Sequence, residues 1–277
     1  MLDEVQQMPE LFPVLRVLAD RPEQPAQFLI LESASPELVK GPAESLAGRV
    51  SFVDVTGFNL RETGAEALPK RWWRGGFPRA FLARNDTASR RWQQDFFRTF
   101  LERDIPHLGI RIPSATLRRF WSMIAHSHGQ IWNASEIGRS LGVKDPTTRR
   151  YLDILTGTYV VQQLPPWFEN LKKRQVKSAQ EGFCIEPILS GSDTLDAYFW
   201  ATHSGAELDL LIFHQGQRIG FEFKTGEAPS TTKSMHVALE DLALDHLHVI
   251  YPGERSFSLT EKITGTPLLA ALDLLDP

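Results

Sequence analysis

The sequence contains little cysteine and no long apolar run. Its single cysteine, Cys184, has no partner for an internal disulfide, and no Cys/His cluster has the spacing of a zinc site. No apolar run approaches the roughly 18 residues that a membrane-spanning helix requires, so no contact with a membrane is expected. Asp3 and Glu4 stand where a signal peptide would carry its basic and apolar parts. We therefore expect a cytoplasmic protein.

Neither sign of charge is in large excess. The formal net charge is −4, with 42% hydrophobic and 23% charged residues, which is ordinary for a globular protein. The chain as a whole therefore does not attract nucleic acid. Any contact with nucleic acid would depend on local basic patches.

The patterning predicts an α/β multidomain protein in four parts. Residues 1–65 alternate short apolar runs, at 28–31 and 50–55, with helical patterns, which is the rhythm of a parallel sheet. Residues 66–128 read as a helical lid or linker. Residues 129–178 read as a winged helix, with helices over 133–141 and 145–155, Asp145 as a cap, and strands within 159–164. Residues 179–277 read as a small α/β domain, with a helix over 183–189, strands at 197–200, 207–213, 218–223 and 247–251, and a helix over 235–242.

Several short motifs resemble one known family when taken together. They are Leu2-Asp3-Glu4-Val5-Gln6, Leu31-Glu32-Ser33-Ala34-Ser35, Leu46-Ala47-Gly48-Arg49, Trp73-Arg74-Gly75-Gly76-Phe77-Pro78 and Leu101-Glu102-Arg103-Asp104. The combination is similar to AAA-type ATPases that carry a C-terminal domain of unknown function, DUF4143-like. One departure is Glu32, which stands where the family has glycine and puts a carboxylate near an anionic ligand.

The resemblance assigns roles in nucleotide binding. Asp3 would hold Mg²⁺ through water and Glu4 would polarise the attacking water, while Ser33 would sense the γ-phosphate. Arg49 would act across a subunit boundary as an arginine finger, which implies a homo-oligomer. The phosphate-binding pattern G-x-x-x-x-G-K-[ST] is absent from these residues. We therefore interpret the chain as an N-terminally truncated member and expect ATP binding only in a full-length relative.

The winged-helix part carries a candidate DNA interface. Its second helix is predicted to expose Thr147, Thr148, Arg149 and Arg150 to a major groove. Further phosphate contacts are predicted from Arg119 and from a basic connector made of Lys172, Lys173, Arg174 and Lys177. The alternative is that these charges form a solvated face and that the winged helix contacts protein.

The last part carries the sharpest constellation of polar residues. Glu207 and Asp209 lie two apart on one predicted strand, and Glu222 and Lys224 lie two apart on the next, so each pair should share a side. An acid on one strand beside Glu-x-Lys on its neighbour resembles the PD-(D/E)xK nuclease superfamily.

That second resemblance implies a metal-dependent nuclease-like domain. Asp209, Glu222 and Glu207 would hold Mg²⁺ or Mn²⁺, Lys224 would assist the nucleophile, and Glu186 would be the helical acid, with Glu181 as the other candidate. The alternative is a salt-bridged polar face without metal.

Compared with the family, a block of residues between Gln180 and Glu181 is expected to be missing. The sequence thus predicts a DNA-associated ATPase relative with a nuclease-like end. A non-catalytic DNA- or protein-binding module and a decayed gene product remain as alternatives.

Overall fold

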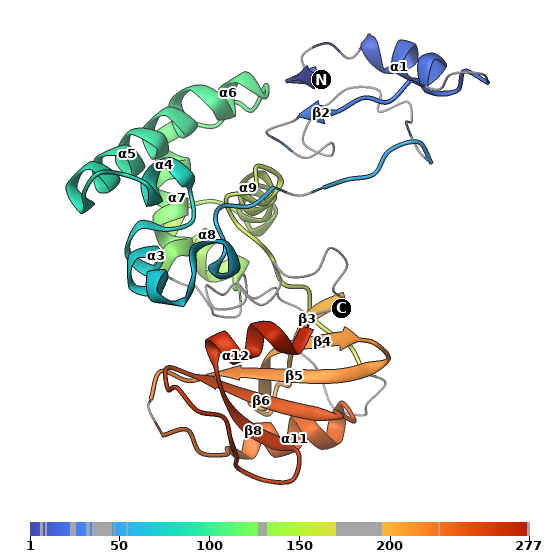
Figure 1. Cartoon of the computed structure of the whole chain (residues 1–277). Helices are drawn as coiled ribbons and strands as arrows, with labels where there is room; N and C mark the ends of the chain where they lie inside the picture. Colours follow the sequence, from blue (N-terminus) through green and yellow to red (C-terminus); the bar gives the residue numbers. More distant parts are fainter. Residues whose placement is uncertain are drawn as a thin grey trace. The chain divides into compact units, whose positions relative to one another are not determined.

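The computed structural model describes the chain except for residues 6–7, 9, 23–25, 32–33, 35–45, 47, 54, 127–131, 170–195, 227 and 276–277. Two compact units are present, one made of residues 1–55, 95–123 and 134–162, the other of 56–94, 124–133 and 163–277. Figure 1 shows the elements of both units. No described helix has the length and apolarity needed to cross a membrane.

A six-stranded mixed sheet forms the largest part of the second unit, in the order β3-β4-β5-β6-β8-β7 (Figure 1). Strands β3, β4 and β5 are antiparallel, β5, β6 and β8 run parallel, and β7 is antiparallel to β8. The strands are β3 Asp196–Ala201, β4 Glu207–His214, β5 Gln217–Phe223, β6 His246–Tyr251, β7 Phe257–Ser258 and β8 Ile263–Pro267. The fold is therefore mixed α/β.

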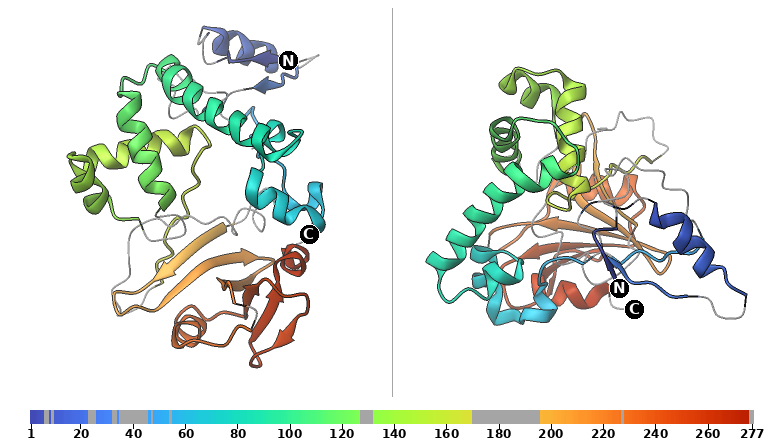
Figure 2. Two further views of the ribbon diagram at one scale, coloured as in Figure 1. Left: turned by 90° about the vertical axis from the view of Figure 1, so that its left-hand side faces the viewer. Right: turned by 90° about the horizontal axis from the view of Figure 1, so that it is seen from above.

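Both faces of this sheet are apolar because a helix covers each of them (Figure 2). Helix α12 (Leu268–Leu272) and the turn η4 (Asp273–Leu275) pack on one face with Phe199, Leu210 and Phe221. Helix α11 (Lys233–Asp241) packs on the other face with Trp200 and other buried residues. Burial on both faces explains why β4 reads as a nearly continuous apolar run from Leu208 to Phe213, interrupted at Asp209.

Two local features set the geometry of the β4–β5 hairpin. Gln215 and Gly216 both have positive φ, 49° and 79°, as the tight two-residue turn between twisted antiparallel strands requires. In β4, Asp209 and Leu210 together stand opposite one β3 residue, because Tyr198 pairs with Leu211 and Trp200 with Leu208. This β-bulge interrupts the side-to-side alternation of β4 at Asp209.

The described residues of the N-terminal segment contain less sheet than the sequence predicts. Strands β1 (Leu2–Asp3) and β2 (Ile30–Leu31) pair in parallel, and helix α1 (Leu11–Ala19) lies between them in the chain. The predicted strand at 50–55 is wrong, since none of its described residues lies in a strand. Its side chains Phe52, Val53 and Val55 are 75%, 77% and 90% exposed. A run of strand-forming residues becomes a strand only where a partner supplies backbone hydrogen bonds.

Helices dominate the middle of the chain, as predicted. In order they are α2 Leu60–Thr63, η2 Ala65–Ala67, α3 Leu68–Arg74, α4 Pro78–Phe81, α5 Asp86–Thr99, the π-helical turn η3 Phe100–Asp104, α6 Ile105–His107, α7 Ser114–His126, α8 Ala134–Leu141 and α9 Asp145–Gly157. The wider turn η3 comes just before Pro106, whose nitrogen cannot donate to the preceding turn. Gly142 ends α8 with φ 73°.

The predicted wing after α9 is not formed. Tyr159 takes φ 58°, and the N–H groups of Val160 and Val161 donate to the Leu155 carbonyl at the end of α9. Closing the helix in this way removes the donors that a hairpin would need. Further along, the N–H of Phe199 donates to the Pro165 carbonyl beside β3. Helices α8 and α9 are thus confirmed, whereas the strands at 159–164 are wrong.

Candidate active site

The polar residues of β4 and β5 meet where β4 begins and β5 ends. Lys224 Nζ lies 2.7 Å from Glu222 Oε1, and the backbone N–H of Phe223 donates to Asp209 Oδ2 at 2.9 Å. The hairpin turn at Gly216 brings these residues together, because it pairs Leu210 with Phe221. The structure therefore joins Asp209, Glu222 and Lys224, as the sequence predicted.

The bulge changes how Asp209 reaches the site. Beyond the last ladder pair, Leu210–Phe221, the N–H of Phe223 is bound by a carboxylate instead of a β4 carbonyl. Strand alternation therefore does not place Glu207 and Asp209 on one side, as the sequence argument assumed. Glu207 is exposed and Asp209 half-buried. Asp209 is therefore more deeply buried than Glu207.

Glu222 is the buried member of the site, with 3% of its surface exposed. Its Oε1 accepts from Lys224, whereas its buried Oε2 has no hydrogen-bond partner among the described residues. Burial, together with the charges of Asp209 and Glu207, outweighs the opposing effect of Lys224 and raises the pKa of the Glu222 carboxyl from 4.5 to about 7. A carboxyl in this state carries a proton for much of the time near neutral pH.

The amine of Lys224 responds to the same surroundings. Burial by itself lowers the pKa of Lys224, but the hydrogen bond to Glu222 and the charges of the neighbouring carboxylates outweigh it and raise the pKa. Lys224 therefore remains a cation at neutral pH. It is one positive charge facing three acidic residues, Asp209, Glu222 and Glu207.

A second polar atom on this sheet was not foreseen from the sequence. The indole Nε1 of Trp200 is buried and has no hydrogen-bond partner in the described part of the chain. Trp200 pairs with Leu208, next to Asp209. An aromatic residue in a predicted strand is normally interpreted as a core residue. The position of Trp200 beside Asp209 becomes visible only from the pairing of β3 with β4 around the bulge.

The remaining metal-site predictions have different outcomes. Glu186 and Glu181 lie outside the described residues. Within the described ranges, no three His, Cys, Asp or Glu side chains gather into a metal-binding group. Two carboxylates and an amine are what the described residues bring together.

The residues predicted to touch nucleotide are only partly described. Asp3 ends β1, and the Glu4 N–H donates to the Leu31 carbonyl at the end of the parallel β1–β2 pair, so both acids lie at a strand end as expected. Arg49 Nε lies 2.6 Å from Asp20 Oδ1 in an exposed ion pair. Ser33 lies outside the described residues.

The predicted DNA-contacting helix presents a narrower polar face than expected. Arg149 and Arg150 of α9 are exposed, but Thr148 is buried and packs close to Gly138 of α8. Asp145 does not cap α9 as predicted, since Lys144 is the residue before the helix and Asp145 accepts from Ser135. Arg119 donates to the Ser140 carbonyl at the end of α8. The basic connector at 172–177 lies outside the described residues.

Comparison with known proteins gives three adjoining family matches. Residues 1–64 match a family described as AAA domain, residues 65–184 a domain of unknown function, DUF8612, and residues 177–270 a domain of unknown function, DUF4143. No solved structure matches the chain.

Two mycobacterial relatives share most of the sequence. The chain is 44% identical to the uncharacterized protein Rv2008c of Mycobacterium tuberculosis over 297 residues, which cover 96% of this chain and 67% of that protein. The uncharacterized protein Mb2031c of Mycobacterium bovis matches equally. The alignment is longer than the chain itself, so the relatives have positions without a counterpart here. The predicted place of the missing block, 180–181, lies outside the described residues.

These matches define the class of the protein. The chain belongs to the AAA-type ATPase family that carries DUF4143 at its C-terminal end.

Proposed function

We propose that the C-terminal sheet domain cleaves phosphodiester bonds in DNA with the help of Mg²⁺ or Mn²⁺. The observation that carries this proposal is the buried Glu222 carboxylate, which has one oxygen on Lys224 and one without a partner, beside Asp209. Such an arrangement is costly for folding unless a further charge or ligand compensates it. A carboxyl whose pKa is strongly raised by burial and by a specific charged neighbour is typical of functional sites.

The described donors are compatible with a hard divalent cation. Mg²⁺ is commonly bound by one or two carboxylates, with water and substrate phosphate completing its shell. Asp209 and Glu222 would supply these carboxylates, and a cation beside them would favour the ionised form of Glu222. When bound, the cation would polarise the phosphate and lower the pKa of a coordinated water.

The protein's own groups would do the rest. Lys224, cationic and 2.7 Å from Glu222 Oε1, would orient the attacking water and balance the charge of the phosphate. The Phe223 N–H holds Asp209 by one carboxylate oxygen, which fixes the direction of the other. Apolar cores on both faces of the sheet exclude water from behind the site.

The test is nicking of supercoiled plasmid by the purified chain with Mg²⁺ or Mn²⁺. Lys224→Ala and Glu222→Gln should each abolish nicking, and the matched control Glu254→Gln, an exposed acid of the same unit, should leave it unchanged. Nicking that persists in Lys224→Ala would refute the assignment, because it would come from another site or another protein.

The non-catalytic module is the second candidate. The exposed Arg149 and Arg150 on α9 favour it, because they form a basic surface outside the sheet domain. Salt-sensitive DNA binding without nicking, unchanged by Glu222→Gln and weakened by Arg149→Gln, would support this reading instead.

Nucleotide binding belongs to the family and is proposed here only for a chain that also carries a phosphate-binding loop. Asp3, Glu4 and Ser33 would then lie at the nucleotide. Arg49 would act from a neighbouring subunit of a homo-oligomer once released from Asp20. Both roles stay predictions.

A further inference from the structure

A patch of exposed aromatic rings and arginines occupies helices α3 and α4 and the start of α5. We call it the aromatic platform and define it by Trp72, Trp73, Phe77, Arg90 and Lys70. The three aromatic side chains are 64%, 57% and 47% exposed. Three large aromatic residues this accessible within one short stretch of chain are a common mark of a binding surface.

The segment that carries the aromatic platform is also rich in basic residues. Residues 65–94 contain seven Lys or Arg and two Asp or Glu, although the whole chain has a net charge of −4. Two of the seven, Arg71 and Arg74, are not among the exposed residues. The exposed basic residues are Lys70, Arg79, Arg84, Arg90 and Arg91. The segment therefore offers a local positive field against an acidic background.

The basic groups and the rings are interleaved. The Arg90 guanidinium lies 5.5 Å from the Trp73 ring centre, and Lys70 Nζ lies 4.2 Å from that of Phe81. Phe77 contacts Trp92, with ring centres 5.8 Å apart. Of the two rings beside these cations only Trp73 is accessible, and there a ligand could stack on the ring and meet the charge of Arg90 at the same time.

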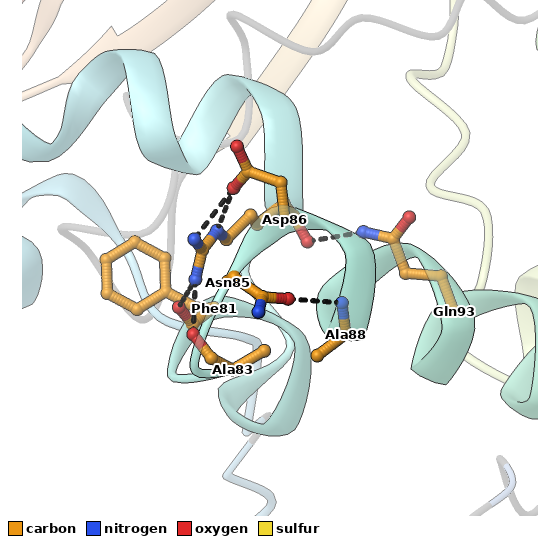
Figure 3. A network of polar contacts seen from close by, with 7 residues as sticks. Phe81, Ala83, Asn85, Asp86, Ala88 and Gln93 are labelled. Atoms are coloured by element: carbon orange, nitrogen blue, oxygen red, sulfur yellow. Dashed lines mark hydrogen bonds and ion pairs between the residues drawn. The ribbon is translucent and has the colours of Figure 1, made fainter.

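One arginine holds the platform rigid (Figure 3). Arg74, at the end of α3, donates to the carbonyls of Phe81, the last residue of α4, and of Ala83, and it pairs with Asp86 at 2.7 Å at the start of α5. Gln93 of α5 donates back to the Arg74 carbonyl. Three short elements are thereby fixed before any ligand arrives, which reduces the entropy lost on binding.

We propose that the aromatic platform binds single-stranded nucleic acid. Unpaired bases would stack on Trp72 and Trp73, and backbone phosphates would meet Arg90, Arg91 and their neighbours. Exposed rings alternating with positive charges are what sequence-tolerant single-strand binding requires. A duplex hides its base faces, so it would use only the charges. This surface is distinct from the carboxylate site and from α9, and it does not rest on the proposed cleavage.

The test measures anisotropy of a labelled oligothymidylate of about 16 nucleotides with the full chain. EDTA is present, so that no metal-dependent cleavage interferes. Trp72→Ala with Trp73→Ala should weaken binding about tenfold or more. Trp73→Phe keeps a ring and should retain most of the affinity. The matched control, Phe168→Ala, removes a 49% exposed ring elsewhere and should change nothing.

A second series separates charge from stacking. Arg90→Gln and Arg91→Gln should each lower the salt dependence by about 0.7 in log–log slope, while Arg255→Gln, an exposed arginine of the sheet domain, should not. An oligouridylate arm shows whether DNA or RNA is the preferred source, and binding of either supports the proposal.

Three outcomes would overturn it. They are no binding by the wild-type chain, equal affinity for duplex with no effect of the tryptophan pair, and self-association that the tryptophan pair abolishes. Circular dichroism spectra matching wild type exclude misfolding of the tryptophan pair, and the Phe and Gln variants test the proposal even if that pair misfolds.

Discussion

Asp209 Oδ2 accepts the backbone N–H of Phe223 at 2.9 Å, so an acidic side chain stands in for a strand carbonyl at the end of β5. The contact links the bulge in β4 to the residue between Glu222 and Lys224. Asp209 therefore contributes to the candidate site in two ways, through the hydrogen bond that fixes the end of β5 and through the charge that raises the pKa of Glu222.

Substitution of Asp209 separates those two contributions. Asp209→Ala leaves the Phe223 N–H without its acceptor, and we expect a loss of about 1–3 kcal/mol in unfolding free energy. Asp209→Asn keeps an acceptor oxygen and should cost less, while it removes a charge that raises the pKa of Glu222. Urea unfolding of both variants checks the order. Equal losses would show that the hydrogen bond contributes little.

Glu222 and His248 impose opposite pH dependences on stability. The Glu222 pKa is raised from 4.5 to about 7, so its contribution is present below 4.5 and lost as pH rises through 7. Burial, with the nearby charge of His246, lowers the pKa of His248 from 6.5 to about 4, so its contribution is present above 6.5 and lost as pH falls through 4.

Substituting one of the two residues at a time should reveal the pH dependence of stability that the other one imposes. Between pH 4.5 and 6.5 the two effects oppose each other in the wild type. In Glu222→Gln stability should fall toward acid, whereas in His248→Gln it should fall toward neutral pH. Thermal melting across this range measures both. A wild-type and Glu222→Gln profile of the same shape would contradict the raised pKa.

A divalent cation should act through the same carboxyl. Because only the ionised form binds, Mn²⁺ should raise the melting temperature of the wild type more at pH 8 than at pH 5.5. Glu222→Gln should show little of this gain, and Glu254→Gln should show all of it. A gain shared by all three proteins would indicate unspecific binding.

Gly138 tests the contact between α8 and α9. Alanine normally stabilises a helix interior by about 1 kcal/mol relative to glycine. Here an added Cβ would lie 2.9 Å from the Val143 carbonyl oxygen and from Thr148 Oγ1. The clash with backbone should outweigh propensity, giving a net loss of about 1–2 kcal/mol for Gly138→Ala. Ser140→Ala, on the exposed side of α8, is the control and should change stability by less than about 0.5 kcal/mol.

Sequence patterns predicted β3 to β6, α11 and the meeting of Asp209, Glu222 and Lys224. They did so because these strands are long and apolar and because Gln215-Gly216 dictates a tight hairpin. Strand β8 carried no such signal, since Thr264-Gly265-Thr266 is neither apolar nor alternating. It forms because its backbone pairs with β6 and its threonines bind the rings of His246 and His248.

The failures have a common physical cause. Residues 50–55 and 159–164 are rich in strand-forming side chains, but strand formation depends on partners that a local pattern does not reveal. After α9, the backbone N–H groups of residues 159–161 donate to carbonyls at the end of that helix, so they are not available to a strand partner. The bulge in β4 was missed for the same reason, since only its register with β3 defines it.

That single extra residue in β4 has a consequence for how the domain can change over time. Deleting Leu210 would restore regular pairing with β3 but would remove a fully buried side chain from the core beside Phe221. Asp209 would then move one step along the ladder and lose the Phe223 N–H. The bulge thus holds Asp209 just beyond the last β4–β5 ladder pair, where its carboxylate accepts the Phe223 N–H.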